Sequence, residues 1–597
     1  MRNLIQYLLF AGVLPFGSSL SRRPEDRPNF VVLFMDDLGY GDLGFNGHPT
    51  THTPNIDNLA RGGKILTTWY SGCSVCTGSR GALMTGRQYT RIGLPGVFGP
   101  TEARGLPHNE TTVAEQLKKA GYATAIVGKW HLGQRKTYLP ANNGFDYYLG
   151  IPYSDDMGNG FTSPCNSNDS SNPYLSSNEK WPWEEYSRAG FIQRKNDEHL
   201  DPAELHLPLV YQDAESGTKV LQQPLDFTTL ALKYENFATN FITKHSQEPF
   251  FLYVPFSHVH TTSKTQPDWQ YAGCAWKNST SRGPFGDALA EADWIVGRIM
   301  ETLTAVGAEE NTLILFSSDN GPNLKFGTSA GSAGLLTGRY AGYWNTGKGS
   351  TWEGGIREPA FAYWKGKITP FSRSSEIVSS LDVFPTLSAL AGVTLPSDRV
   401  FDGRDVSSVL LEAEGKSPHD FLFFYGTCHK GKDNYPDGFS ITAVRHGKYK
   451  AHWCTGPGLG GDVDRQNIVY PNFPLLFDVE RDPSESIPIS VGELPQEAEH
   501  RDAMERIMKA YAFERATFTH GTLVPEPDDA EERPGEYGIC CDRSRGCDCS
   551  EDGIELPIGL LNIGTRSHHD FYHHILGEVE PVPPNKAQLL LRGEWNF

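Results

Sequence analysis

Short, fully apolar segments alternate with amphipathic ones over the first two thirds of the chain. The runs at 30–35, 123–127, 250–254 and 312–316 are apolar on both faces, which predicts buried parallel strands. Residues 111–120, 287–306 and 379–390 have the apolar spacing of helices that pack one face against a sheet. This alternation predicts an α/β fold, with a large doubly wound mixed sheet flanked by helices.

The pattern changes near residue 400. Apolar segments at 421–425, 441–444 and 448–453 follow one another without helical crossovers, which predicts a short antiparallel sheet, and residues 499–518 predict a helix. We therefore expect a main domain at 29–395, a smaller C-terminal subdomain at 396–525 and a Cys-rich, His-containing tail at 526–597.

The first 19 residues predict a cleaved secretory signal peptide. An apolar run after Arg2 ends in small residues, and it is shorter than the roughly 20 residues that a bilayer requires. No other segment is long enough to span a membrane. We expect passage through the secretory pathway to a lysosomal or extracellular site, and the glycosylation sequons at Asn109, Asn168 and Asn278 fit that route.

Composition narrows the class of partner. The 597 residues are 38% hydrophobic and 21% charged, as in globular proteins. A formal net charge of -19 without a basic stripe argues against nucleic acid as a partner.

Chemically capable residues follow the predicted strands directly. Asp36 and Asp37 end the first strand, and Asp319 and Asn320 end the last one. In open α/β sheets ligands bind beyond the carboxyl ends of the strands. These hard oxygen donors suit Ca²⁺ or Mg²⁺ rather than zinc, although an ordinary Asp-rich turn before Gly39 is an equal alternative for the first pair alone.

A cysteine segment lies between these strands. In Cys76-Thr77-Gly78-Ser79-Arg80, Ser79 predicts a helix N-cap, so Cys76 would lie just before a helix N-terminus. Backbone N–H groups and Arg80 would favour an anion there. A buried structural cysteine is the alternative for these five residues alone.

Several motifs together carry a resemblance to a known family. The cysteine segment with Leu83 and Thr85–Arg87 resembles the signature of the type I sulfatases, in the alkaline phosphatase-like superfamily. The other motifs of that family occur in its order, at Asp36–Asp42, Gly128–Gly133, Ser318–Gly321 and Gly347–Pro359. The resemblance covers 29–392, marks 29–395 as the catalytic domain and extends to the C-terminal subdomain. Residues 150–154 and 282–287 are most similar to the arylsulfatase A branch, with the N-acetylgalactosamine-6-sulfatase branch next, and 330–345 resemble an insertion relative to the former.

This resemblance implies hydrolysis of sulfate monoesters, in aryl sulfates, sulfated sugars or sulfolipids. It implies that the formylglycine-generating enzyme converts Cys76 to formylglycine. The implied catalytic residues are Cys76, Arg80, Lys129, His131, His260 and Lys348. The implied substrate-binding residues are Lys129, Ser154, His260 and Lys348. The implied Ca²⁺ ligands are Asp36, Asp37, Cys76, Asp319 and Asn320.

The implied reaction uses the hydrated aldehyde at position 76. One hydroxyl of this diol attacks sulfur while His260 protonates the departing alcohol or phenol, and His131 takes a proton from the second hydroxyl so that sulfate leaves. A sulfated small molecule, glycan or glycolipid would be the substrate, and a homo-oligomer is compatible with the sequence.

Two alternatives remain open. Gly78 stands where the family usually has proline, so the chain could bind sulfated glycans with Cys76 unmodified. A phosphatase or phosphodiesterase of the same superfamily is the second alternative, although the sequence does not display the usual Ser or Thr nucleophile or further metal ligands.

The remaining cysteines predict disulfides. We expect Cys73 to be left over, as one of nine after Cys76 is set aside. The tail set is expected to pair internally, at Cys540, Cys541, Cys547 and Cys549. Two further bridges of open connectivity would join Cys165, Cys274, Cys428 and Cys454.

Overall fold

The computed structural model describes residues 27–100, 102–162, 165, 206–262, 269–427, 439–459 and 467–522. The predicted signal peptide and the tail, with its four cysteines, lie outside the described residues, as does Cys428. Within the described part, Cys165 and Cys274 form a disulfide, Cys454 is also disulfide-bonded and Cys73 is unpaired, as predicted. Cys76 is likewise a free cysteine in this structure.

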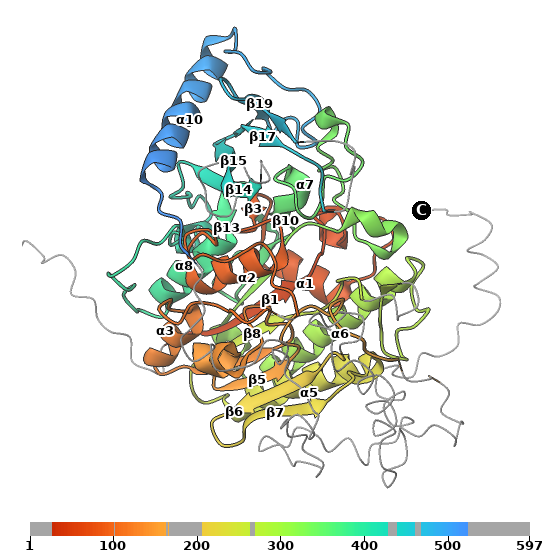
Figure 1. The fold of residues 1–597 in the computed structure, drawn as a ribbon. Coiled ribbons are helices and arrows are strands. Elements are labelled where there is room, and N and C mark those ends of the chain that lie inside the picture. The colour runs from red at the N-terminus through yellow and green to blue at the C-terminus, as the bar shows by residue number, and fades with distance from the viewer. Residues whose placement is uncertain are drawn as a thin grey trace, which may run out of the picture.

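A ten-stranded mixed sheet forms the centre of the molecule (Figure 1). Its middle strands are parallel neighbours, whereas β11 (Phe361–Tyr363) and β6 (Leu209–Asp213) run antiparallel to the strands beside them. This confirms the predicted large mixed sheet. The spatial order is β12 (Ser372–Ser374), β2 (Lys64–Leu66), β11 (Phe361–Tyr363), β9 (Thr312–Ser318), β1 (Asn29–Met35), β8 (Phe250–Pro255), β4 (Ala123–Val127), β5 (Tyr147–Gly150), β6 (Leu209–Asp213) and β7 (Gly217–Gln222).

Helices cover both faces of this sheet. Alternate side chains of β1 enter two separate apolar cores, Phe30, Val32 and Phe34 on one side and Val31, Leu33 and Met35 on the other. The first core includes side chains of α2 (Cys76–Thr85), α3 (Val113–Lys119) and α8 (Val383–Leu390). The second includes side chains of α1 (Pro54–Gly62), α5 (Leu230–Lys244) and α6 (Pro284–Ala305). A strand buried on both faces therefore has no polar side, which explains its continuous apolar sequence.

Several helix starts differ from the sequence prediction, and two of them have a clear structural reason. The helix expected at 379–390 begins only at Val383, because Ser379 pairs in a strand and forms a capping box with Asp382. The Ser79 N-cap is wrong, since α2 already begins at Cys76 with Val75 as its N-cap. The Gly78 N–H donates to Gly96 O at 3.1 Å, so a distant carbonyl satisfies this helix end instead of a local side chain.

A second sheet confirms the predicted C-terminal architecture. It is antiparallel, and side chains of α10 (Ala498–Thr517) join the apolar core beside it. Its order is β14 (Leu422–Thr427), β15 (Phe439–His446), β16 (Tyr449–His452) and β19 (Leu475–Asp478). Two small sheets complete the fold: β10 (Arg357–Glu358), β3 (Trp69–Tyr70) and β13 (Val378–Ser379), and β17 (Cys454–Thr455) with β18 (Ile468–Val469). No helix in the described residues is long and apolar enough to cross a bilayer.

Buried charges join the second sheet to α7 (Glu353–Ile356). Lys450 of β16 donates to Glu353 at 2.8 Å and lies 3.2 Å from Glu485, and all three side chains are fully buried. Glu485 accepts a hydrogen bond from the Glu353 N–H at 2.7 Å, and Tyr70 donates to the Glu353 carboxylate. Burial raises the pKa of Glu353, but Lys450 and Arg445 outweigh it and lower that pKa to about 2.

Lys450→Met tests this junction. It leaves two buried carboxylates without their shared cation, so we expect a loss of about 3–5 kcal/mol in the free energy of unfolding, measured by urea titration. Lys416→Met, in an ion pair whose lysine is 78% exposed, is the control and should leave the free energy of unfolding nearly unchanged, because water screens an exposed pair. Equal losses for the two variants would contradict the role of Lys450.

Candidate active site

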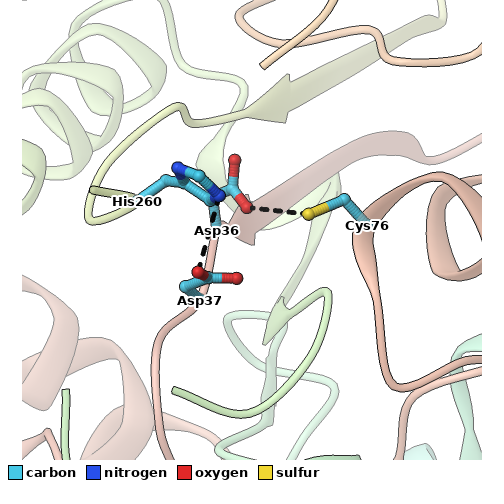
Figure 2. Close-up of side chains that lie close together, drawn as sticks. All are labelled: Asp36, Asp37, Cys76 and His260. Atoms are coloured by element: carbon cyan, nitrogen blue, oxygen red, sulfur yellow. Dashed lines mark hydrogen bonds and ion pairs between the residues drawn. The ribbon is translucent and has the colours of Figure 1, made fainter. Parts of the chain in front are cut away.

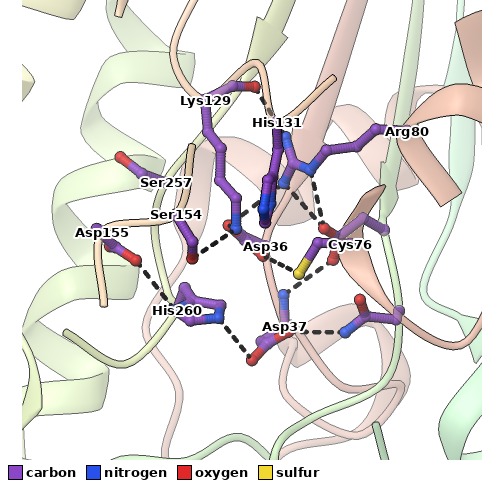
Figure 3. A network of polar contacts seen from close by, with 12 residues as sticks. Asp36, Asp37, Cys76, Arg80, Lys129, His131, Ser154, Asp155, Ser257 and His260 are labelled. Atoms are coloured by element: carbon purple, nitrogen blue, oxygen red, sulfur yellow. Dashed lines mark hydrogen bonds and ion pairs between the residues drawn. The ribbon is translucent and has the colours of Figure 1, made fainter. Parts of the chain in front are cut away.

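The carboxyl ends of the central parallel strands meet at one edge of the sheet. There the Asp36 N–H donates to His258 O at 2.9 Å and the Asp319 N–H donates to Met35 O at 3.0 Å. The Lys129 N–H likewise donates to Pro255 O at 2.7 Å. The loops after β1, β8, β9 and β4 are thereby fixed to one another, and their side chains converge (Figure 3).

Cations surround the first of these carboxylates. Lys129 Nζ donates to Asp36 Oδ2 at 2.6 Å, and the Arg80 guanidinium lies 3.3 Å from the same oxygen. Burial raises the pKa of Asp36, but Lys129 and Arg80 outweigh it and hold that pKa well below its ordinary range. Arg80 also donates to Asp319 Oδ2 through Nε at 3.1 Å and Nη2 at 2.9 Å. Burial and the like charge of Asp36 nevertheless raise the pKa of Asp319 to about 6.

Lys348 links the cysteine to the other carboxylate and to a histidine. Its Nζ lies 2.6 Å from Asp37 Oδ1, 3.2 Å from Cys76 Sγ and 3.1 Å from His260 Nε2. Burial lowers the pKa of Lys348, but Asp37 and the neighbouring acids outweigh it and raise that pKa well above its ordinary value. Figure 2 shows the cysteine, both aspartates and His260 facing one another, with Cys76 Sγ 3.7 Å from Asp36 Oδ1.

His260 has a carboxylate on each side. Its Nδ1 lies 3.0 Å from Asp155 Oδ1 and 2.7 Å from Thr261 O, and its Nε2 lies 3.6 Å from Asp37 Oδ2. Burial and Lys348 disfavour protonation, but the carboxylates, with Asp37 the largest, outweigh them and raise the pKa of His260 well above its ordinary value. The sequence reasoning missed Asp155. Its signal was an Asp-Asp pair directly after Ser154, the same pattern as at Asp36–Asp37.

His131 and Ser154 lie on the Lys129 side of the site (Figure 3). Ser154 Oγ accepts a hydrogen bond from Lys129 Nζ at 3.0 Å. His131 Nε2 bonds Phe98 O at 3.0 Å, so Nε2 carries the proton and Nδ1 carries a lone pair. Burial and the Lys129 charge hold the pKa of His131 well below its ordinary value, so the ring is neutral. Its Nδ1 is buried and has no hydrogen-bond partner among the described residues.

The donor set fits a hard divalent cation. Asp36, Asp37, Asp319 and Asn320 offer only carboxylate and amide oxygens. Asp37 Oδ2 and Asn320 Oδ1 are buried and accept no hydrogen bond from the described residues. A buried acceptor without a partner destabilises the fold, and a bound cation would supply that partner. The ligand atoms of Asp36, Asp37, Cys76 and His260 lie within 4.8 Å of one another. Asp155 and Asp156 form a second such group with His260, which the sequence reasoning did not find.

Comparison with known proteins identifies the class. The model of the sulfatase family matches residues 28–393, and that of the C-terminal region of aryl-sulfatase matches 417–549. The chain therefore belongs to the sulfatase family, and it is a sulfuric ester hydrolase.

Individual relatives are similar over most of their length. Arylsulfatase A of Bos taurus is 38% identical to this chain. The aligned region covers 88% of this chain and 96% of the bovine protein. Arylsulfatase G of Rattus norvegicus is 36% identical, and the aligned region covers 86% of this chain and 92% of the rat protein. Among solved structures, the PsFucS1 sulfatase from Pseudoalteromonas sp. has a TM-score of 0.65 at 28% identity, covering 83% of this chain and 92% of that one.

Gly78 is explained by packing at the start of α2. A Cβ at position 78 would lie 2.7 Å from Cys73 Sγ, 3.0 Å from Cys73 Cβ and 3.1 Å from Tyr89. Cys73 is itself buried, and burial raises the pKa of its thiol to about 12, so it stays an uncharged packing group. The sulfur of Cys73 thus takes the space that a side chain at position 78 would need.

A double-mutant cycle tests this packing. We expect Gly78→Ala to lower the free energy of unfolding by about 1–3 kcal/mol through overpacking. Adding Cys73→Ala should restore at least ~0.5 kcal/mol relative to the sum of the single variants, since the sulfur is removed. Gly99→Ala, where a Cβ meets no atom within 4 Å, is the control. Strict additivity in urea unfolding would show that Cys73 does not restrict position 78.

Proposed function

We propose that this chain hydrolyses sulfate monoesters with a formylglycine at position 76 and bound calcium. The observation that carries the proposal is the position of Lys348, whose ammonium lies within 3.2 Å of Cys76 Sγ, Asp37 Oδ1 and His260 Nε2. A nucleophile at position 76, a cation ligand and an acid would then act at one point, and a fixed ammonium would neutralise the sulfate there.

Formylglycine and calcium would have distinct roles in this reaction. A hydrated formylglycine at 76 supplies an oxygen nucleophile for sulfur, and calcium supplies positive charge toward the sulfate oxygens. Asp36, Asp37, Asp319, Asn320 and residue 76 would hold the calcium.

The chain's own residues would provide the remaining charge and position. Lys129 and Lys348 would bind sulfate oxygens, and Ser154 orients the Lys129 ammonium. Arg80 would hold Asp319 in place through two hydrogen bonds and Asp36 through an ion pair.

Proton transfer is divided between two histidines with opposite protonation states. The carboxylates beside His260 favour its protonated form, from which it can give a proton to the leaving oxygen. Neutral His131 has a free lone pair on buried Nδ1 and can accept one. This opposition supports the acid and base roles that the family resemblance implies.

We also propose a sulfated glycan or glycolipid as substrate and a lysosomal or extracellular location. Ps i-CgsB, which is 25% identical with a TM-score of 0.62, has been solved in complex with k-i-k-neocarrahexaose and covers 85% of this chain. That likeness supports a sugar chain as the substrate class, and membership of the sulfatase family supports a sulfate ester on it.

Calcium binding can be measured without turnover. After chelation and dialysis, isothermal titration of calcium into the protein should show near-stoichiometric binding. Asp37→Asn should weaken it by about tenfold or more, because a charged ligand is lost. Asp156→Asn, in the second acidic group, is the control and should bind calcium normally. Undiminished binding by Asp37→Asn would exclude this ligand set.

The function can be decided by measuring the mass of the peptide that contains residue 76. In secreted protein, the tryptic peptide 65–80 should contain a form lighter than the thiol form, and the same preparation should release sulfate from 4-nitrocatechol sulfate. Cys76→Ala should abolish release, because the nucleophile is removed. If only the thiol peptide appears and no sulfate is released, the chain is a binding protein for sulfated compounds.

A further inference from the structure

A buried carboxylate to which the proposed reaction gives no role lies beside His260. The side chain of Asp155 is 0% exposed, and its oxygens accept no hydrogen bond from any other described residue. Its carboxylate forms an ion pair with His260, with Oδ1 3.0 Å from Nδ1 (Figure 3). Burying a carboxylate is unfavourable unless it is paired, so the contact with His260 is what compensates the burial of this one.

The backbone holds both partners at the same edge of the sheet. Asp155 follows β5, and its loop is tied to the loop after β4, because the Trp130 N–H donates to Ile151 O at 3.0 Å. His260 lies in the loop after β8, where its N–H donates to Ser257 O at 3.2 Å. The ion pair therefore joins two loops that are each fixed to the sheet.

The surroundings of His260 Nδ1 fix its proton. Nδ1 lies 2.7 Å from Thr261 O and 3.0 Å from Asp155 Oδ1, and both of these atoms are acceptors. Nδ1 therefore carries a hydrogen. Thr261 is the next residue along the chain and moves with the histidine, whereas Asp155 fixes the ring to a different loop.

This orientation of the ring decides which atom faces the sulfate site. With Nδ1 toward Asp155, His260 Nε2 lies 3.1 Å from Lys348 Nζ, and the same ammonium lies 3.2 Å from Cys76 Sγ. A ring flipped by half a turn would place Cε1 near the ammonium instead. Carbon Cε1 has no proton to give, so the flipped ring could not act as an acid.

We propose that Asp155 is a positioning residue, which holds His260 in the one ring orientation that can protonate the leaving oxygen. When the bond between sulfur and the leaving oxygen breaks, its electron pair stays on that oxygen, which takes the Nε2 proton. The neutral ring keeps its Nδ1 hydrogen, which Asp155 continues to accept. This inference rests on the proposed function, and it adds a residue that acts through His260 without touching the substrate.

Such a role makes a specific prediction about leaving groups. A weakly basic phenolate can leave without a proton, whereas a more basic one depends on the acid. We therefore expect Asp155→Asn to slow sulfate esters of basic phenols more than esters of acidic ones. Its KM should not rise, because the loss of a negative charge favours an anionic substrate.

The test compares 4-nitrophenyl sulfate with 4-methylphenyl sulfate, which are similar in size but differ in the basicity of the phenolate. The measured quantity is kcat/KM, which does not depend on steps after the phenol has left. The ratio of the two values within one preparation is also independent of the fraction of active enzyme. Asp155→Asn should increase the preference for the nitrophenyl ester about tenfold or more.

Two further variants separate positioning from a general loss of structure. In a His260→Gln background, Asp155→Asn should not change the ratio further, since the residue acts through that ring. Asp293→Asn is the matched control, because Asp293 is also a buried carboxylate, and it accepts a hydrogen bond from the Ile56 N–H at 2.8 Å. It should lower stability and leave the ratio unchanged.

Three results would overturn the role of Asp155: an unchanged ratio in Asp155→Asn, an equal increase in Asp293→Asn, or a further increase in the His260→Gln background. In each case the unsubstituted protein still hydrolyses both esters, so the proposed function stands. If the unsubstituted protein hydrolyses neither ester, the proposed function fails, and the role of Asp155 fails with it.

Discussion

Mutual neutralisation of buried charges is the constraint on which the rest of this structure depends. Asp36, Asp319, Arg80 and Lys129 have side chains that are at most about 1% exposed, and each ion would cost several kcal/mol if it were left unpaired. The parallel strands satisfy this constraint, because their carboxyl ends bring acids and bases from distant segments to one edge. Helices on both faces of the sheet then keep water out, which strengthens every ion pair in the site.

The strands of the main sheet were predictable because burial on both faces requires a continuous run of apolar residues. Strand β4 was predicted to the residue, and β1 and β8 to within one residue, because nothing polar interrupts them. Helix starts were less predictable. Ser79 has the preferred side chain for an N-cap, yet the carbonyl of Gly96 caps that turn, and no local pattern encodes a partner brought there by the fold.

The same difference between local patterns and distant partners explains which site residues could be predicted. Residues such as Lys348 and His260 were found because whole motifs surround them and resemble a family signature. Asp155 and the Lys450–Glu353 pair were missed because each depends on a partner about a hundred residues away. A lone acid or lysine looks like a surface residue until its partner is placed beside it. Long-range electrostatic pairing is therefore the part of this molecule that sequence reasoning could not reach.

Cys76 is only 2% exposed, in the first turn of a helix packed within the main domain. A modifying enzyme must take hold of several residues around its target, so it cannot act on this side chain after the chain has folded. Under the proposed function, enzymatic modification of Cys76 would therefore compete with folding and would have a single opportunity. The active fraction of a preparation would then depend on how fast the chain folded during synthesis. Two samples of identical sequence and stability could therefore differ permanently in specific activity.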